Sequence, residues 1–341
     1  MYITPRPQVA DDPLYAVRLA MAGVLAYAAV PLIDPALPPV IAAFPVGLIA
    51  AQRMGFSPVK ALAGPIAFIV VVWIVAFVVA QLRPMPLVYV TMMALLYFTG
   101  YRMILSTGAG AGMLLIVVTV LLSVMGMSST AALEGMRESF TEASLLTLLL
   151  FPILFAVFPP RSRETFVEEP VPSTGNINTG AAIRAGVLLL LSFWLYAILP
   201  PSDMMMAVVA AMVLVFPTSR AVWAEAAQRI RATCYGGVMG LMILSLFTVS
   251  PHLSILLLMI FLSGLFLGSR MLSGPQPSMV YQYAFTVALA LIAGALSTQD
   301  PGYATFTRIA LTLMGALAAT LLIALLDALT GWHDQSTTKV T

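Results

Sequence analysis

The sequence predicts an all-α integral membrane protein with twelve transmembrane helices in two parallel six-helix repeats, both termini being cytoplasmic. Hydrophobic residues make up 61% of the 341 residues and charged residues 9%, a composition outside the range of soluble globular domains. Twelve apolar runs approach the roughly 20 residues that a membrane-spanning helix needs. Lysine and arginine concentrate in alternate connections between these runs, and several short patterns occur in both halves of the chain.

Each apolar run predicts one transmembrane helix, and the runs fall into two series of six. Their continuity distinguishes them from the short alternating segments of a transmembrane barrel. The first series covers about 15–33, 37–52, 61–82, 86–105, 109–127 and 140–158. The second series covers about 182–199, 203–219, 232–250, 252–269, 278–297 and 306–329.

The distribution of lysine and arginine predicts the orientation of these helices. If the N-terminus is cytoplasmic, 13 of these residues lie in or beside cytoplasmic connections, and only 3 lie on the opposite side, namely Arg83, Arg137 and Arg308. Positive residues are enriched on the cytoplasmic side of membrane proteins. We therefore expect both termini in the cytoplasm and an even number of spans.

Four sequence patterns recur in the same order in the two halves. They are Ala16-Val17-Arg18-Leu19 with Ala182-Ile183-Arg184-Ala185, Phe44-Pro45 with Phe216-Pro217, Gly100 to Met103 with Gly268 to Met271, and Arg137 with Arg308. Six spans in each half make the repeat parallel, with a pseudo-twofold axis along the membrane normal. We expect a first repeat at 1–158, a cytoplasmic linker at 159–181, and a second repeat with a short tail at 182–341.

No pattern in the chain predicts an enzyme, and we expect neither a metal nor another cofactor. The only lysines are Lys60 and Lys339, and neither lies in a P-loop that could bind nucleotide phosphates. His252 and His333 are far apart in sequence and have no neighbouring Cys or Glu to complete a metal site. A formal net charge of +2 gives no reason to expect nucleic-acid binding.

Arginines that recur in both halves are the candidate substrate-binding or gating residues. Arg102 and Arg270 end the fourth run of each half, where they either gather an anion at a cytoplasmic entrance or only anchor the topology. Arg18 and Arg184 lie about one turn inside the first run of each half. They either snorkel to the lipid headgroups or face an internal path for anions.

Prolines and acidic residues complete the candidate site. Pro45 and Pro217 interrupt the second run of each half, which indicates either a packing kink or a broken helix beside a transport path. The candidate proton carriers are carboxylates near the ends of the runs, namely Asp34, Asp203, Glu142 and Asp327. A solvated turn or a helix cap is the alternative role for such carboxylates.

The segment from Asp203 to Leu244 resembles the fusaric acid resistance and aromatic acid exporter family. An apolar run is followed by a short polar turn and an R-I-x-x-T-x-x-G-x-x-x-G pattern. Two six-span halves also look like that family, and each half resembles the six-span unit of the plant malate channels. Typical members carry large cytoplasmic domains, so this chain resembles a compact branch with the membrane portion alone. The residues that carry the motif are Arg229, Ile230, Arg231, Thr233, Gly236 and Gly240.

This resemblance implies proton-coupled export of aromatic or other small organic acids across the bacterial inner membrane. The partners that it implies are the organic anion, the lipid bilayer, a periplasmic adaptor protein and an outer-membrane channel, and an oligomer is compatible with the sequence. Two alternatives stay open. One is a passive organic-anion channel, which needs no proton-carrying acid, and the other is a membrane scaffold whose arginines are only topological anchors.

Overall fold

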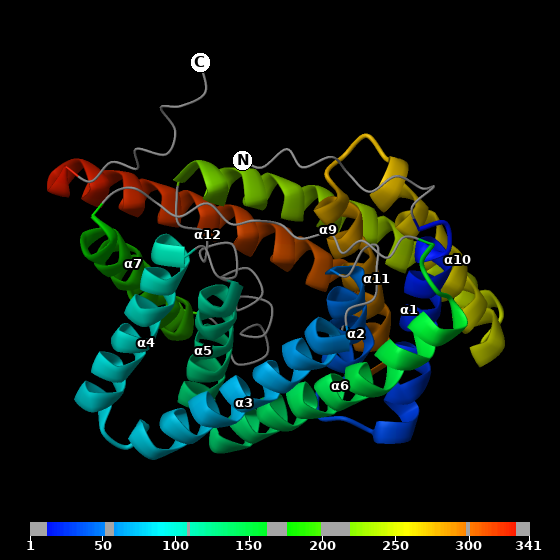
Figure 1. Ribbon diagram of the computed structural model, residues 1–341, viewed down its shortest axis with the longest axis horizontal. Helices are drawn as coiled ribbons and strands as arrows, with labels where there is room; N and C mark the ends of the chain where they lie inside the picture. The colour runs from blue at the N-terminus through cyan, green and yellow to red at the C-terminus, as the bar shows by residue number, and fades with distance from the viewer. Residues whose placement is uncertain are drawn as a thin grey trace. The chain divides into compact units, whose positions relative to one another are not determined.

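The computed structural model describes residues 12–51, 58–107, 110–161, 176–198, 219–297 and 301–331. All secondary structure in these ranges is helical (Figure 1). The helices of the first half are α1 (Tyr15–Ile33), α2 (Pro38–Ala51), α3 (Pro58–Leu82), α4 (Pro86–Thr107), α5 (Gly110–Ser128) and α6 (Thr130–Val157). Those of the second half are α7 (Ile177–Ile198), α9 (Ser219–Val249), α10 (Leu253–Ser273), α11 (Ser278–Ser297) and α12 (Pro301–Thr330).

The described helices correspond to eleven of the predicted runs, and the run predicted at 203–219 lies outside the described residues except for Ser219, which begins α9. Within the described ranges, nine helices are long and apolar enough to cross a membrane. Two further apolar helices, Pro38–Ala50 and Leu317–Thr330, are shorter. The chain is therefore a multi-pass membrane protein, while the twelve spans and their orientation stay predictions.

Helix α6 begins at Thr130, well before the predicted residue 140. Ser129 caps its N-terminus, because the Ser129 Oγ accepts the backbone N–H of Ala132 at 3.0 Å. Arg137 and Glu142 consequently lie within the helix, and the prediction that Arg137 lies in a connection is wrong. Hydropathy ends an apolar run at its first charged residues, although Glu, Arg and Ala are good helix formers.

Helix α9 also begins earlier than predicted, at Ser219 and not near residue 232. Arg229 and Arg231, which the sequence places before the start of this helix, are therefore helical residues, and the predicted start of the helix is wrong. The physical reason is the same, since alanine, glutamate and arginine dominate the first turns of this helix.

The chain divides into two compact units, each of which contains helices from both halves. Unit 1 holds α1, α2, α10 and α11 with most of α6 and α9, and unit 2 holds α4, α5 and α7 with most of α12. Helix α3 is divided between them. Unit 1 comprises Met1–Val70, Gly135–Glu168 and Gln228–Phe306, and unit 2 comprises Val71–Glu134, Glu169–Ala227 and Thr307–Thr341.

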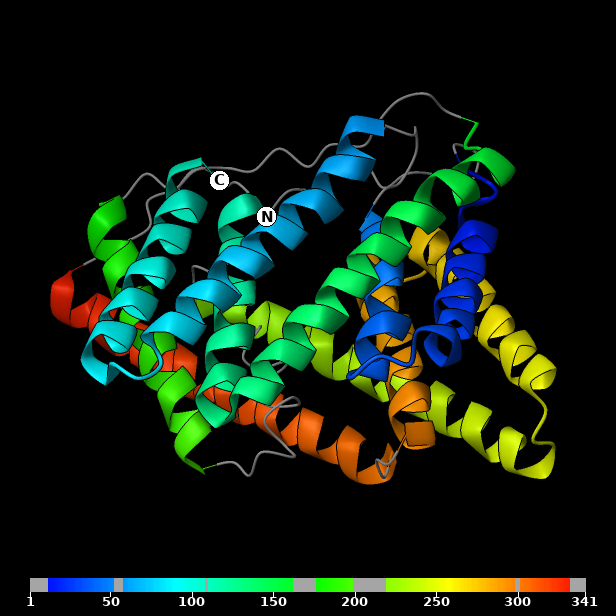
Figure 2. The same cartoon turned by 90° about the horizontal axis from the view of Figure 1, so that it is seen from below.

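The helix pairs that pack together in unit 1 have equivalents, by the predicted repeat, among the pairs that pack together in unit 2 (Figures 1 and 2). In unit 1, α1 packs on α10 and α10 packs on α11. In unit 2, α7 packs on α4 and α4 packs on α5. Each unit thus combines the first helix of one predicted half with the fourth and fifth helices of the other. The predicted halves are interleaved in the packing, and their boundaries stay a prediction.

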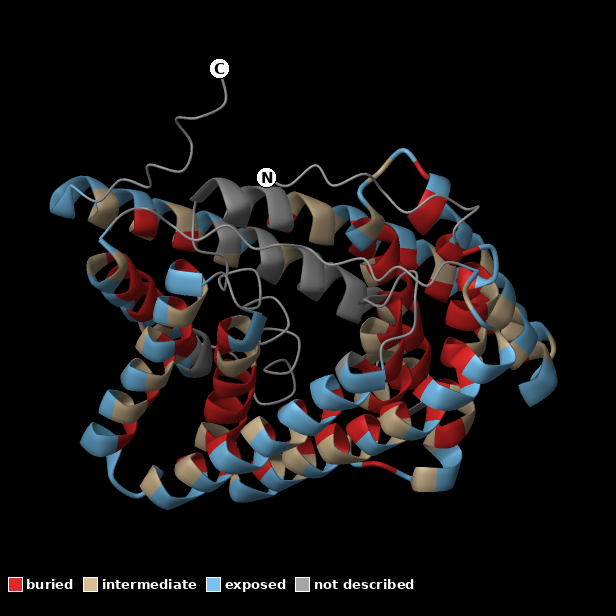
Figure 3. Cartoon of the chain, in the orientation of Figure 1, coloured by how far each residue is buried: buried red, intermediate tan, exposed pale blue. Residues whose placement is uncertain are grey.

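Small residues hold α1 close to α10 in unit 1. A Cβ atom placed on Gly268 would lie 2.9 Å from the Cα atom of Ala16, and one on Gly264 would lie 2.8 Å from the Cα atom of Ala20. Such close backbone approach is how helices gain packing energy in lipid, where the hydrophobic effect between them is absent. Buried residues extend from this contact along α11 (Figure 3).

Replacing Gly268 with Ala is expected to destabilise the protein by about 1–3 kcal/mol, because the new methyl group overlaps the backbone of α1. The matched control is Gly64→Ala in α3, where an added Cβ has no atom within 4 Å. At that position Ala should be neutral or stabilising, since it is a better helix former than Gly. Unfolding in detergent micelles measures both, and equal stability of the two variants would contradict the packing described for α1 and α10.

Candidate functional site

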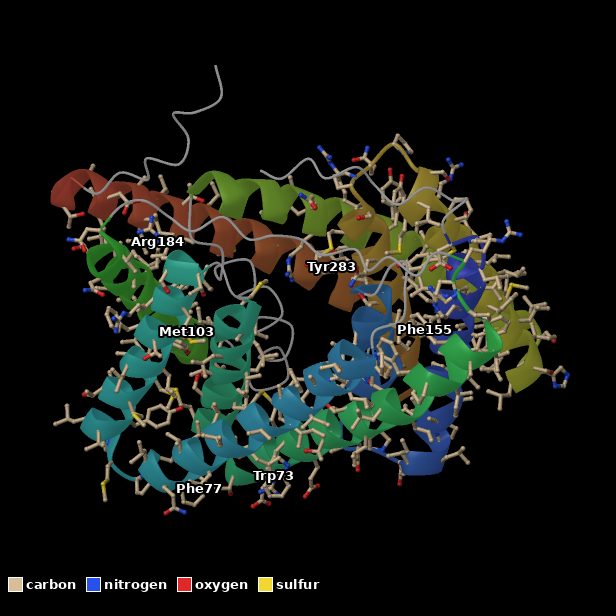
Figure 4. All side chains as sticks on the ribbon, viewed as in Figure 1. Trp73, Phe77, Met103, Phe155, Arg184 and Tyr283 are labelled. Atoms are coloured by element: carbon tan, nitrogen blue, oxygen red, sulfur yellow. The ribbon has the colours of Figure 1, made fainter. Side chains whose placement is uncertain are left out.

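Helix α7 carries a buried arginine, Arg184, that is paired with a carboxylate of α12. The Arg184 side chain is 1% exposed. Its Nη1 and Nη2 atoms donate to Oδ1 and Oδ2 of Asp327 at 3.2 and 3.1 Å, and Nη1 also donates to the Gly180 carbonyl at 3.1 Å. Figure 4 shows Arg184 where α7 approaches α12. Two parallel hydrogen bonds to one carboxylate make this a strong and geometrically specific pair.

Helix α1 carries the equivalent arginine, Arg18, in unit 1. Both of its Nη atoms contact the carboxylate of Asp12, with 3.3 Å between Nη1 and Oδ1, and both side chains are 1% exposed. Nη1 also donates to the Phe158 carbonyl, just after α6, at 2.9 Å. The ring centroid of Phe155, labelled in Figure 4, lies 4.1 Å from the guanidinium carbon. This guanidinium is therefore enclosed by a carboxylate, a carbonyl and an aromatic ring.

The burial of Arg18 and Arg184 excludes the interpretation that they snorkel. A snorkelling side chain keeps its charge at the headgroups, whereas these two guanidinium groups are covered by protein. Arginine stays protonated in proteins, and a buried charge inside a membrane is costly unless it is paired. The two aspartates supply that pairing, and each arginine is held in a geometry that suits a carboxylate.

The two pairs differ in how completely the protein covers them. The Asp327 side chain is 22% exposed, whereas that of Asp12 is 1% exposed. The Arg18 guanidinium also lies against the Phe155 ring. Any exchange of one carboxylate for another needs a route to the arginine, and the partly exposed Asp327 offers that route at Arg184.

Arg102 and Arg270, the predicted entrance gate, lie at exposed positions near the C-terminal ends of α4 and α10. The guanidinium carbon of Arg270 is 5.5 Å from the ring centroid of Phe266, one turn earlier in α10. Exposure suits both an entrance that attracts anions and a topological anchor. The gating role of these two arginines stays a prediction.

Pro45 lies buried inside α2, where it removes a backbone donor from the helix. Two residues further on, the Gly47 carbonyl accepts a hydrogen bond of 3.1 Å from Nε2 of Gln282 in α11. A buried polar side chain of α11 thus holds the interrupted part of α2. The other predicted proline, Pro217, lies outside the described residues.

Of the predicted proton carriers, Asp327 is joined to the buried Arg184. Asp34 is exposed and ends α1 in a left-handed conformation with φ of 52°, as expected for a turn residue. The Oε2 atom of Glu142 is buried and has no hydrogen-bond partner among the described residues. Asp203 lies outside those residues. In the described part of the chain, no group of three or more His, Cys, Asp or Glu side chains could hold a metal ion.

The arginines of the family motif contact α11 and the connection before it. Nη2 of Arg229 is 3.4 Å from the Tyr283 hydroxyl, and its guanidinium carbon lies 4.7 Å from the centre of that ring (Figure 4). Nη1 of Arg231 donates to Oε1 of Gln276 at 3.0 Å. These contacts join α9 to neighbouring segments of unit 1.

The remaining motif residues bring the backbone of α9 against α11. The hydroxyl of Thr233 donates to the Arg229 carbonyl at 2.8 Å, so it bonds within its own helix. A Cβ atom placed on Gly236 would lie 2.9 Å from the Cβ of Val287, and one on Gly240 would lie 3.5 Å from the Cβ of Leu291. The glycines of the motif are therefore packing residues of the α9–α11 contact.

Comparison with known protein families gives a match over residues 190–322, to the family described as fusaric acid resistance protein-like. The matched residues include the motif of α9 and the whole of α10 and α11. This is the family that the sequence resembles, and the match covers the second half of the chain only. No curated protein and no solved structure matches the chain, and the relation to plant malate channels stays a prediction.

Proposed function

We propose that the protein is a proton-coupled transporter that exports small organic acids, because residues 190–322 match the fusaric acid resistance protein-like family. The family and the multiple apolar helices make it a membrane transport or resistance protein. We place it in the bacterial inner membrane, with a periplasmic adaptor protein and an outer-membrane channel as its proposed partners.

The Arg184–Asp327 pair is the observation that carries this proposal. A substrate carboxylate has the shape and charge of the Asp327 carboxylate, so it can take the same two hydrogen bonds from Arg184. Arg184 is almost fully buried and cannot serve two carboxylates equally well. Substrate binding therefore displaces Asp327 from the guanidinium.

In this proposal, the displaced Asp327 carboxylate couples the movement of the acid to the movement of a proton. In the proposed cycle a proton from the cytoplasm neutralises this carboxylate while the substrate occupies Arg184. The loaded site then contains a guanidinium, one substrate carboxylate and a neutral Asp327, which has the same net charge as the empty site. One proton moves with each acid, and the step is electrically neutral. Accumulated acid in the cytoplasm drives export, and membrane potential does not.

Purified protein in vesicles loaded with 4-hydroxybenzoate tests this function, with protein-free vesicles as the baseline for passive leakage. Potassium and valinomycin set the membrane potential independently of the pH of the lumen. We expect protein-dependent efflux that speeds up when the lumen is acidified and does not respond to potential. Efflux that follows the potential indicates a passive anion channel, and no efflux above baseline indicates a scaffold.

Replacing both Arg102 and Arg270 with Ala is expected to raise the substrate concentration for half-maximal transport several-fold without changing the maximal rate. In the proposed role, exposed positive charges raise the local concentration of anions but do not hold the substrate during the transport step. Added salt should shrink the difference, because it screens exposed charges. Arg83→Ala is the control, since Arg83 is also exposed but lies on the predicted opposite side. Unchanged transport kinetics in the double variant would show that these arginines play no part in the transport pathway.

A further inference from the structure

Helix α9 carries an exposed arginine, Arg231, inside an apolar segment that is long enough to cross a membrane. This candidate span covers Ala226–Val249, and Arg231 lies five residues after its start. An exposed arginine at such a position is costly unless it meets a counter-charge. Arg18 and Arg184 each have an aspartate, whereas no salt bridge between described residues includes Arg231. The counter-charge for Arg231 therefore has to come from outside the described part of the protein.

The exposed face of α9 continues from Arg231 as an aromatic and aliphatic stripe. The residues 4, 7, 11 and 18 positions after Arg231 lie within roughly 40° of it around the helix axis. They are Tyr235, Val238, Met242 and Val249, and their exposed fractions range from 50% to 84%. This face has the polarity of a phospholipid, because a cation stands at one end, a tyrosine comes next and aliphatic side chains follow.

Contacts with α11 and with the connection before it hold the charged end of this face in place. Nη1 of Arg231 donates to Oε1 of Gln276 at 3.0 Å. The backbone N–H of Gln276 donates to the Tyr281 hydroxyl at 3.3 Å, and the Tyr281 ring stacks on that of Tyr235 with 6.5 Å between the ring centres. Arginine has five N–H donors, so the bond to Gln276 leaves others for a phosphate. The guanidinium is thus oriented before any lipid binds.

A second exposed arginine adds positive charge at the same end. Arg270 lies in the last turn of α10 and precedes Gln276 by six residues. No salt bridge between described residues includes Arg270. Two arginines without a described carboxylate favour an anionic headgroup over a zwitterionic one, whose own cation competes for the phosphate.

We propose that this face of α9 is a binding site for an anionic phospholipid. The lipid phosphate accepts hydrogen bonds from the Arg231 guanidinium, whose planar shape suits two parallel bonds to a phosphate. An acyl chain lies along Tyr235 and Val238, which a soluble phosphate would leave uncovered. By the predicted orientation of the helices, this lipid belongs to the cytoplasmic leaflet. The site does not depend on the proposed transport function.

The single cysteine of the chain provides a probe at this site. Cys234 is exposed and follows Arg231 by three residues, so the two lie on the same side of α9. The full chain is labelled at Cys234 with a fluorophore and placed in vesicles of phosphatidylcholine with a minor fraction of phosphatidylglycerol. Bromine atoms on the acyl chains of one lipid or the other quench the label on contact. We expect phosphatidylglycerol to be preferred at the label at least about tenfold over its share of the lipid, because each arginine contributes a factor of about five.

Arg231→Gln is expected to lower this preference about fivefold, because the headgroup loses its main contact. Arg231→Lys should keep most of the preference, since lysine also attracts anionic lipid. Arg83→Gln is the matched control, because Arg83 is an exposed arginine on the predicted opposite side, and it should leave the preference unchanged. Equal quenching by the two lipids in the wild-type protein, or a preference that survives Arg231→Gln, would overturn the site.

Soluble glycerol phosphate distinguishes a lipid site from a site for any phosphate. It carries the phosphate of the headgroup but has no acyl chain to cover the apolar stripe. We expect an excess of it to leave quenching by brominated phosphatidylglycerol unchanged. Loss of that quenching would show that the phosphate alone suffices, and it would overturn the proposed lipid site.

Discussion

Replacing Asp327 with Asn is expected to separate the movement of the acid from the movement of a proton. Asparagine carries no charge and takes up no proton, so Arg184 loses the carboxylate that neutralises it. A substrate carboxylate then supplies the negative charge at the site and crosses without a proton. We also expect 4-hydroxybenzoate to bind about tenfold more tightly or better, because the competing carboxylate is gone.

Vesicle efflux at a set membrane potential measures this change. Wild-type efflux should not respond to potential, whereas Asp327→Asn should respond to potential and lose its dependence on lumen pH. Asp34→Asn makes the same substitution at an exposed turn and should behave as wild type. If Asp327→Asn keeps the pH dependence and the indifference to potential, Asp327 is not the proton carrier. Glu142, with its buried Oε2, is then the next candidate among the described residues.

Replacing Asp12 with Ala is expected to destabilise the protein by about 3–5 kcal/mol. The substitution leaves the Arg18 guanidinium buried with a carbonyl and an aromatic ring as neighbours but without a counter-charge. Unfolding in detergent micelles measures the loss. Asp34→Asn at an exposed turn is the control, and it should change stability by less than about 0.5 kcal/mol, because asparagine also tolerates the left-handed backbone at this position.

A second substitution distinguishes a lost charge pair from a lost fold. In Asp12→Leu combined with Arg18→Met, both charges are replaced by apolar groups, which is often neutral for buried pairs. We expect this double variant to recover most of the stability and to transport 4-hydroxybenzoate, because Arg18, unlike Arg184, has no partly exposed carboxylate beside it. A double variant that is stable but inactive would show that Arg18 takes part in transport.

The sequence predicted the position of most helices well because long apolar runs are the dominant signal in a membrane protein. Helix ends were harder to predict, as α6 and α9 show. Their first turns contain arginine and glutamate, which hydropathy excludes from a span although they favour a helix. Arg137, Arg229 and Arg231 were therefore assigned to connections.

The repeat led to Arg18 and Arg184 but could not show which way they face. In lipid, the outer face of a helix is as apolar as its packed face, so periodicity does not separate the two. For this reason the sequence could not distinguish buried arginines from exposed ones. It made both pairs candidates, the exposed Arg102 and Arg270 as well as the buried Arg18 and Arg184.

Only one of the two carboxylates that pair with the buried arginines could be selected from the sequence. Asp327 was a candidate because it lies near the end of an apolar run, whereas Asp12 precedes the first run and was not among the candidates. The repeat offered no help, because the two aspartates occupy different positions in their halves: Asp12 lies before α1, and Asp327 lies in α12. The sequence feature that could have identified Asp12 as the partner of Arg18 is its position six residues earlier. That separation is short enough for the two side chains to meet.

Proton uptake during substrate binding tests the carboxylate exchange at Arg184 most directly. Weakly buffered protein in detergent is mixed with 4-hydroxybenzoate, and a pH indicator reports the protons taken from solution. We expect about one proton to be taken up for each anion bound, because the displaced Asp327 becomes protonated, and no uptake in Asp327→Asn. Binding to the wild-type protein without proton uptake would contradict the exchange.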